Sequence, residues 1–233
     1  MPMANPKSAW NVGIRDSMRK ESRVILALDE VRPERAFRVA EQVSDLVDAI
    51  KINWPLVLAT SPDTITRLSE LAPVICDFKV ADIPNTVSLI VSQAVKRGAE
   101  GVIVHGFTGS DSVRAAVEAA DGRSIFVVTE MSHPGGAEYT APAAESLAKM
   151  AVDCGASGII APATRPERVA VLRKIVGDLL ILSPGVGAQG GSASATLDKG
   201  ADYVIVGRSI YWAEDPRAAA SQVVNEAKSA RPR

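Results

Sequence analysis

Residues 74–98 read VICDFKVADIPNTVSLIVSQAVKRG and contain one complete unit of the predicted fold. The first part is a short apolar run rich in Val and Ile, as expected of a buried strand. In residues 87–97 the apolar side chains recur every three or four positions, which is typical of an amphipathic helix. Pro84 stands where a helix start tolerates proline, and Gly98 follows the periodic segment as a C-terminal cap would. The stretch therefore predicts a strand, a turn and a helix.

The same alternation continues along the rest of the chain. Short apolar runs, each nearly continuous in apolar character, are separated by segments with helical periodicity, as expected of parallel strands covered on both faces. The runs occupy residues 24–29, 47–52, 74–79, 101–106, 125–130, 158–163, 179–184 and 203–207. Eight such units in 233 residues predict a closed (β/α)8 barrel, the TIM barrel, because an open doubly wound sheet of this length would have fewer strands.

The composition is that of a globular domain. Of the residues, 47% are hydrophobic and 23% are charged, and the formal net charge is −1. So small a charge creates no general attraction for nucleic acid or for an anionic membrane, so an anionic ligand needs a local site. We expect one α/β barrel domain at residues 23–228, preceded by an extension at residues 1–22 that is a short helix or a tail.

The sequence predicts a cytoplasmic enzyme. Its apolar runs are shorter than the ~18 residues that a membrane-spanning helix needs, and residues 1–23 lack the apolar core of a secretory signal. Cys76 and Cys154 fit neither a disulfide framework nor a zinc-binding pattern, so we expect both to be buried, reduced thiols.

Charged residues gather where the predicted strands end, which is where barrels of this type carry their active sites. Alternation along the third strand turns Asp77 and Lys79 to the same side, toward the barrel axis, and Asp82 follows in the next turn. A buried ammonium group needs carboxylates to compensate its charge, and two aspartates would also keep Lys79 protonated, ready to donate a proton. Lys51 and Asp29, at the ends of earlier strands, would extend the cluster into an alternating chain of acids and amines.

Each of these residues also has a structural interpretation. Asp82 would serve as the N-cap of the following helix, and Asp77 with Lys79 would form a buried structural pair. Lys51 would extend along the surface, and Asp29 would be a cap. Four unrelated structural roles at neighbouring strand ends explain the pattern less well than one catalytic cluster.

A second cluster lies in the glycine-rich segment SPGVGAQGG, residues 183–191, and in VGRS, residues 206–209. Glycines let backbone N–H groups approach an anion closely, and the loops after strands seven and eight are the usual phosphate site of these barrels. Gln189 offers an amide donor and Arg208 a planar charged fork. A glycine-rich loop alone would equally be a turn, but its position together with Arg208 predicts phosphate binding.

The segment TEMSHPG, residues 129–135, places Ser132 after the fifth strand, where its hydroxyl would bond a polar ring. A loop hydroxyl bonded to its own backbone fits the spacing equally well. His105 and His133 stand in no Ser/His/Asp or metal-ligand spacing, so we interpret both as structural.

Together these segments resemble the orotidine 5′-monophosphate decarboxylase family, particularly its short archaeal-type members. The resemblance extends from about Val24 to Tyr211. DFKVADIPNT looks like the family's Asp-x-Lys-x-x-Asp signature, which related sugar-phosphate enzymes share. TEMSHPG, SPGVGAQGG and VGRSIY are similar to its pyrimidine and phosphate loops, and the four segments in this order are specific for the family.

The resemblance implies decarboxylation of orotidine 5′-monophosphate to UMP, the last step of de novo pyrimidine nucleotide synthesis, without a metal ion or organic cofactor. It implies that Lys79 protonates ring carbon C6, that Asp77 lies beside the substrate carboxylate and that Lys51 completes the charge network. The implied substrate contacts are Asp29 and Lys51 at the ribose, Ser132 at the pyrimidine, Gln189 at the pyrimidine and phosphate, Gly207 and Arg208 at the phosphate, and Pro184. Asp82, Ile83 and Thr86 would reach into the site of a neighbouring subunit, which implies a homodimer.

Two other functions stay open. A metal-dependent sugar-phosphate lyase of the same superfamily, such as a keto-gulonate phosphate decarboxylase or a hexulose phosphate synthase, would use the two aspartates to help bind Mg²⁺. Ser132 and the GVGAQGG loop fit a nucleotide better. A non-catalytic barrel that binds a phosphate ligand would have no need of a buried lysine flanked by acids.

Overall fold

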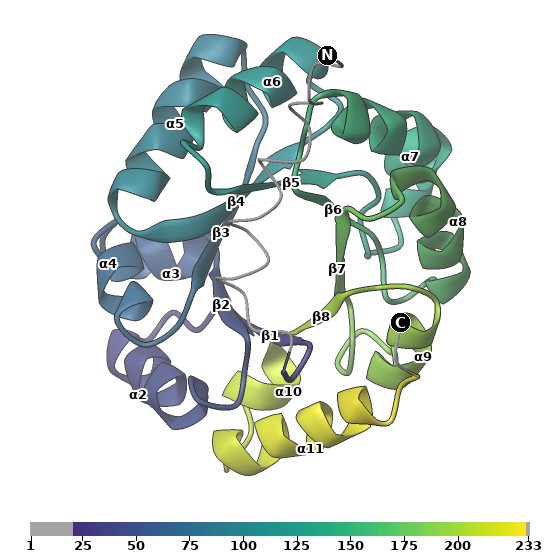
Figure 1. The fold of residues 1–233 in the computed structure, drawn as a ribbon. Coiled ribbons are helices and arrows are strands. Elements are labelled where there is room, and N and C mark those ends of the chain that lie inside the picture. Colours follow the sequence, from purple (N-terminus) through teal and green to yellow (C-terminus); the bar gives the residue numbers. More distant parts are fainter. Residues whose placement is uncertain (1–20, 232–233) are drawn as a thin grey trace, which may run out of the picture.

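A computed structural model describes residues 21–231 of the chain. Eight parallel strands form a closed barrel in sequence order, β1 to β8, and the helices form a ring around it (Figure 1). The predicted (β/α)8 barrel is therefore confirmed. Residues 1–20 of the predicted extension lie outside the described residues.

Each strand coincides with one of the apolar runs. The strands are β1 (Val24–Leu28), β2 (Ala49–Ile52), β3 (Val74–Val80), β4 (Ala99–His105), β5 (Ser124–Val128), β6 (Gly158–Ile160), β7 (Leu180–Pro184) and β8 (Tyr203–Val206). The sixth run is longer than its strand, but its last residues still bond to the seventh, since Ala163 N donates to Pro184 O at 2.9 Å.

The helices follow the strands in turn. They are α2 (Pro33–Val43), α3 (Trp54–Ala59), α4 (Thr64–Ser69), α5 (Pro84–Lys96), α6 (Ser110–Ala119), α7 (Gly136–Asp153), α8 (Pro166–Val176), α9 (Ala193–Asp198), α10 (Arg208–Tyr211) and α11 (Pro216–Lys228). Pro33, Pro84 and Pro166 each occupy the first helical position, where the missing N–H is not needed.

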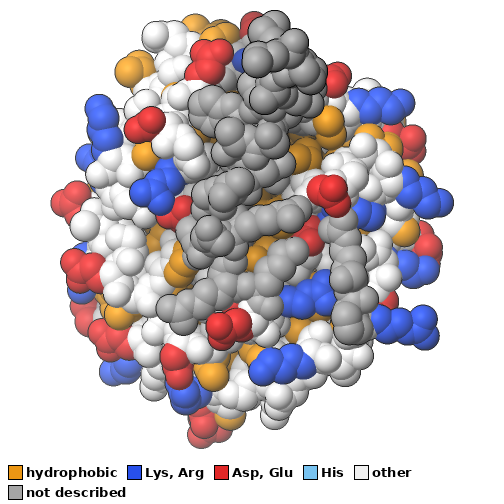
Figure 2. Space-filling model, in the orientation of Figure 1, with side chains coloured by type: hydrophobic (Ala, Val, Ile, Leu, Met, Phe, Trp, Pro, Cys, Tyr) orange, Lys and Arg blue, Asp and Glu red, His pale blue; other side chains and the backbone are white. Residues whose placement is uncertain are grey.

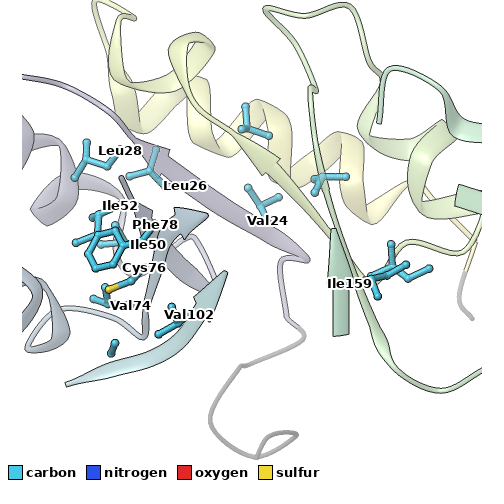
Figure 3. Close-up of a cluster of buried hydrophobic side chains, with 14 of the residues drawn as sticks. Val24, Leu26, Leu28, Ile50, Ile52, Val74, Cys76, Phe78, Val102 and Ile159 are labelled. Carbon is cyan, nitrogen blue, oxygen red and sulfur yellow. The ribbon is translucent and has the colours of Figure 1, made fainter. Parts of the chain in front are cut away.

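Alternate strand residues pack on opposite sides of the barrel wall. Residues such as Leu26, Ile50 and Cys76 pack in the layer between the strands and the helices (Figure 3). Ile25 and Ile75 belong to a second cluster, inside the barrel. This period of two sets the direction of every polar side chain on a strand.

Phe126 fills the middle of the barrel and is fully buried. Gly101 and Gly158 on the two flanking strands make room for its ring, because a Cβ on either would lie 2.9 Å from a Phe126 ring carbon. The barrel is therefore a packed core rather than a pore. On the outside, acidic and basic side chains are interspersed around the rim of the molecule (Figure 2).

Candidate active site

A cavity of about 700 Å³ opens at the carboxyl ends of the strands. All eight strands, or the loops that follow them, contribute lining residues. Those that were predicted from the sequence are Asp29, Lys51, Asp77, Lys79, Ser132, Pro184, Gln189, Gly207 and Arg208. The structure thus brings the charged cluster, the Ser132 segment and the glycine-rich loop together around one space.

Four charged side chains form a continuous chain on the cavity wall. Lys79 Nζ donates to both carboxylate oxygens of Asp77 at 2.8 Å. Lys51 Nζ lies 3.0 Å from Asp77 Oδ2 and 3.7 Å from Asp29 Oδ1. Lys51 is buried and is therefore not a surface lysine, whereas the Lys79 side chain is 30% exposed. Both lysines line the cavity, and Lys79 is the more accessible of the two ammonium groups.

Burial and charge oppose each other at the two inner members of the chain. Burial disfavours the Lys51 ammonium, but the carboxylates of Asp77 and Asp29 outweigh it and raise the pKa of Lys51 above its usual value. Burial likewise disfavours the Asp77 carboxylate, yet the Lys51 and Lys79 cations hold the pKa of Asp77 below its usual value. Both groups are therefore charged at neutral pH.

An irregularity in β3 accompanies the close approach of Lys79 to Asp77. The pairing with β4 passes from Cys76↔Val102 to Val80↔Val104, so residues 77–79 lie opposite a single residue. Within this bulge Lys79 has φ +44°, a left-handed conformation that residues other than glycine rarely adopt. Strand alternation predicted that the two side chains meet but not the bulge in which they do.

The side chain of Phe78, between Asp77 and Lys79, points to the outer side of the barrel. The Phe78 ring stacks on Trp54 of α3 with the ring centroids 4.4 Å apart, and Trp54 Nε1 donates to the Phe78 carbonyl at 3.1 Å. These contacts tie the bulge to the outer helical layer.

The glycine-rich loop after β7 folds back on itself beside the cavity. Gly191 N donates to Gly185 O at 3.0 Å, and Gly187 N donates to Gly191 O at 2.9 Å. Gln189 of this loop accepts a hydrogen bond from Ser132 Oγ at 3.1 Å. The Ser132 hydroxyl thus bonds the seventh loop and not its own backbone.

Arg208 and Gly207 line the cavity directly after β8. The Arg208 guanidinium lies 5.8 Å from the centre of the Trp212 ring. Within residues 21–231 it forms no ion pair, so its charge is available to an anionic ligand.

Asp82, Ile83 and Thr86 do not line the cavity of their own chain. Asp82 Oδ1 accepts from Ile83 N at 2.7 Å, and its exposed carboxylate forms no ion pair with Lys79 in the described structure. The expectation that Asp82 compensates Lys79 within one chain is therefore wrong, because Asp82 lies beyond the end of β3. Nor is Asp82 the N-cap of α5, since Ile83 occupies that position.

Several other residues line the cavity that the sequence did not single out. They are Asn53, Thr164, Arg165 and Tyr211. His133, which we interpreted as structural, also lines the cavity. Thr164 and Arg165 follow the sixth apolar run, so the rule that polar residues at strand ends build the site would have found them. His105 does not line the cavity; burial, with the nearby Lys79 charge, lowers its pKa from 6.5 to about 4.

The match to known proteins is extensive. A family model described as orotidine 5′-phosphate decarboxylase / HUMPS family matches residues 22–223. The chain belongs to this family. Its relatives include the orotidine 5′-phosphate decarboxylase of Methanosarcina mazei, which is 58% identical over 212 residues that cover 90% of this chain and 96% of the relative. The orotidine 5′-phosphate decarboxylase of Thermococcus kodakarensis is 50% identical over 210 residues, covering 89% of this chain and 97% of the relative.

Solved structures of the family share the fold. The orotidine 5′-monophosphate decarboxylase from Methanocaldococcus jannaschii, complexed with the inhibitor BMP, has a TM-score of 0.85 and 42% identity and covers 88% of this chain and 98% of that chain. The decarboxylase from Pyrococcus horikoshii has a TM-score of 0.83 and 44% identity, covering 88% and 99%. None of the described helices of this family member is long and apolar enough to cross a membrane.

Proposed function

We propose that this chain decarboxylates orotidine 5′-monophosphate to UMP, with Lys79 as the proton donor to ring carbon C6. The observation that carries the proposal is the alternating chain of acids and amines on the cavity wall, which ends at Lys79. Membership of the family, and relatives of this name that match nearly the whole chain, support the same reaction.

The reaction requires stabilisation of charge at one carbon. When the bond from C6 to the carboxylate breaks, the electron pair stays on C6, and the pyrimidine ring cannot delocalise it well. An ammonium group already held in place stabilises this developing charge without reorganising. Lys79, held by both oxygens of Asp77, fits that role and then donates the proton that forms the new C6–H bond.

Asp77 would contribute by its negative charge. Next to the substrate carboxylate it repels a like charge, and the repulsion disappears as the carboxylate becomes neutral CO2. The cations on both sides keep the Asp77 carboxylate ionised, as its lowered pKa indicates. The same side chain therefore anchors Lys79 and disfavours the bound substrate relative to the transition state.

The remaining lining residues would hold the rest of the nucleotide. Asp29 and Lys51 would contact the ribose, Ser132 with Gln189 the pyrimidine, and Arg208 the phosphate. Gln189 and the Gly207 backbone complete the predicted contacts to the phosphate, and Pro184 is a further predicted substrate contact. Because the phosphate is remote from the reacting bond, its binding energy can be used to close the loop at residues 183–191 over the ring.

We also propose a homodimer in which Asp82, Ile83 and Thr86 complete the neighbouring site. These residues lie off the cavity of their own chain, and Ile83 is 65% exposed. An apolar groove of about 340 Å³ lies between α3, α4 and α5, and α5 also carries Thr86. Leu58 and Leu89 on the same helices are 79% and 60% exposed, which suits burial against a second copy.

A cytoplasmic location is part of the proposal. Cys76 and Cys154 are buried and unpaired, as is usual in a reducing compartment. Burial raises the pKa of the Cys76 thiol to about 12, so it is an unreactive thiol.

The first experiment follows the absorbance of orotidine 5′-monophosphate in excess EDTA. Rapid conversion to UMP is expected from the wild-type chain. No conversion, with activity on a sugar phosphate that returns when Mg²⁺ is added, would favour the metal-dependent lyase. Tight UMP binding without either activity would favour a non-catalytic barrel.

Two variants test the assigned roles. Lys79→Ala is expected to lower kcat by at least ~10³-fold, because it removes both the electrostatic and the proton-donating group. Arg208→Ala is expected to raise KM and leave residual turnover, because it removes a group that contacts the phosphate. Turnover close to wild type in Lys79→Ala would contradict the mechanism.

A further inference from the structure

Glu130 is a fully buried carboxylate that the proposed mechanism does not use. It lies just beyond β5 at the carboxyl end of the barrel, and two guanidinium groups bind it. Arg165 Nε lies 2.9 Å from Glu130 Oε1, and Arg168 Nε lies 2.9 Å from Oε2. Such pairing is what makes a buried carboxylate tolerable.

The two arginines differ in their other contacts. Arg165 also donates to the backbone carbonyl of Met131 and lines the cavity. Arg168 turns to α7, where it lies 3.5 Å from a Glu145 carboxylate oxygen and 3.5 Å from the Ala141 carbonyl. Of the two arginines, only Arg165 therefore connects the buried carboxylate to the backbone beside Ser132.

Ser132, the residue after Met131, is bonded by the loop that also contains Arg165. Thr164 Oγ1 donates to the Ser132 carbonyl at 2.9 Å, so consecutive carbonyls are bonded by Thr164 and Arg165. The backbone on both sides of the Ser132 side chain is thereby fixed. Its hydroxyl then donates to Gln189 at 3.1 Å.

We propose that Glu130 is a positioning residue for the pyrimidine end of the site. Through Arg165 it fixes the backbone around Ser132, so that the Ser132 hydroxyl meets Gln189 and the substrate ring. The inference rests on the proposed function, which assigns the pyrimidine contact to Ser132. A glutamine in place of Glu130 keeps the size of the side chain but removes the charge-assisted bonds that anchor Arg165.

Glu130→Gln and Arg168→Gln form a matched pair, assayed by steady-state kinetics on orotidine 5′-monophosphate, by UMP affinity and by thermal unfolding. Glu130→Gln removes both ion pairs of the buried carboxylate, whereas Arg168→Gln removes one and leaves the ion pair with Arg165. Both variants are expected to lower the unfolding temperature. Only Glu130→Gln is expected to lower kcat/KM, by about 10- to 100-fold, as misplacement of a substrate-contacting group does. An equal loss of kcat/KM in Arg168→Gln would overturn the inference.

Ser132→Ala separates positioning from general damage. If Glu130 acts through Ser132, the Glu130→Gln/Ser132→Ala double variant has about the same kcat/KM as the less active of the two single variants. This is expected because the effects of substitutions at coupled residues do not add. Losses that multiply in the double variant would overturn the inference.

Arg165→Gln covers the case in which Glu130→Gln does not fold. It removes the donor to the Met131 carbonyl and leaves Glu130 paired with Arg168. The same loss and the same non-additivity with Ser132→Ala are expected, and additive losses count against the inference. An inactive wild-type chain would overturn the proposed function and this inference with it, whereas an active wild type with additive variants overturns the inference alone.

Discussion

Lys79 has a left-handed backbone conformation, which residues other than glycine rarely adopt. Its φ is +44°, and a left-handed conformation costs an L residue about 1–2 kcal/mol. The bulge in β3 and the two bonds from Lys79 Nζ to Asp77 hold it there. Strain of this kind at a reactive group is typical of functional sites.

The strain predicts a difference between two inactive variants. Lys79→Gly and Lys79→Ala both remove the ammonium group, but only glycine adopts the left-handed conformation freely. We expect Lys79→Gly to be about 1 kcal/mol more stable than Lys79→Ala in urea unfolding. Equal stabilities, or a more stable alanine variant, would show that the backbone at position 79 relaxes once the lysine is gone.

The lowered pKa of His105 predicts that the stability of the folded protein depends on pH. Burial, followed by the Lys79 charge, lowers its pKa from 6.5 to about 4. Because the unfolded chain binds this proton more readily than the folded protein, the free energy of unfolding falls as pH drops from 6.5 toward 4 and is unaffected above that window. Urea unfolding at several pH values is expected to show a shallower decline for His105→Gln. Parallel curves for the two proteins would rule out this role of the imidazole.

At the scale of elements, the loop after β7 is where closure over a nucleotide would occur. Gly187 and Gly190 both have positive φ, +72° and +92°. They differ in their surroundings, because a Cβ on Gly187 would lie 2.3 Å from Ser209 Oγ, whereas nothing lies within 4 Å of one on Gly190. Ser209 is next to Arg208, so the loop and the start of α10 pack directly together.

This packing predicts different effects of two alanine substitutions. Both introduce similar backbone strain, but only Gly187→Ala pushes the loop against the residue after Arg208. We expect Gly187→Ala to raise KM by about 10-fold or more, since small displacements of positioning groups are costly, and Gly190→Ala to raise it less. Steady-state kinetics on orotidine 5′-monophosphate measure this, and a larger effect at position 190 would contradict it.

At the scale of the whole molecule, the proposed homodimer predicts complementation between inactive chains. Lys79→Ala damages the site of its own chain, whereas Asp82→Asn damages that of its partner. If the subunits of the two variants exchange at random in an equal mixture, about half of the dimers are heterodimers, and each heterodimer has one intact site of its two. About a quarter of wild-type activity is therefore expected. A mixture of Lys79→Ala with Lys51→Ala is the control, because both residues serve their own site and no activity should return. Failure of the first mixture to regain activity would contradict the shared site.

Some features follow from the sequence because they depend on local order. The continuous apolar runs predicted the barrel strands, since burial on both faces selects Val- and Ile-rich segments. The carboxyl ends of the strands share one face of the barrel, and this rule placed Asp77, Lys51 and Arg208 at one site, although they lie at the ends of three different strands. Neither step requires a knowledge of packing.

Other features depend on contacts between distant segments. Ser132 meets Gln189 across 57 residues, and Arg165 meets Glu130 across 35, so no local pattern contains either pair. The bulge at Lys79 depends on how β3 pairs with β4, and Asp82 falls outside its own cavity because α5 starts beyond the end of that strand. The sequence by itself therefore determined the barrel and the residue types at its mouth. Only the packing of the loops against one another decided which of those residues touch, because side-chain geometry is set by neighbours that the chain brings together on folding.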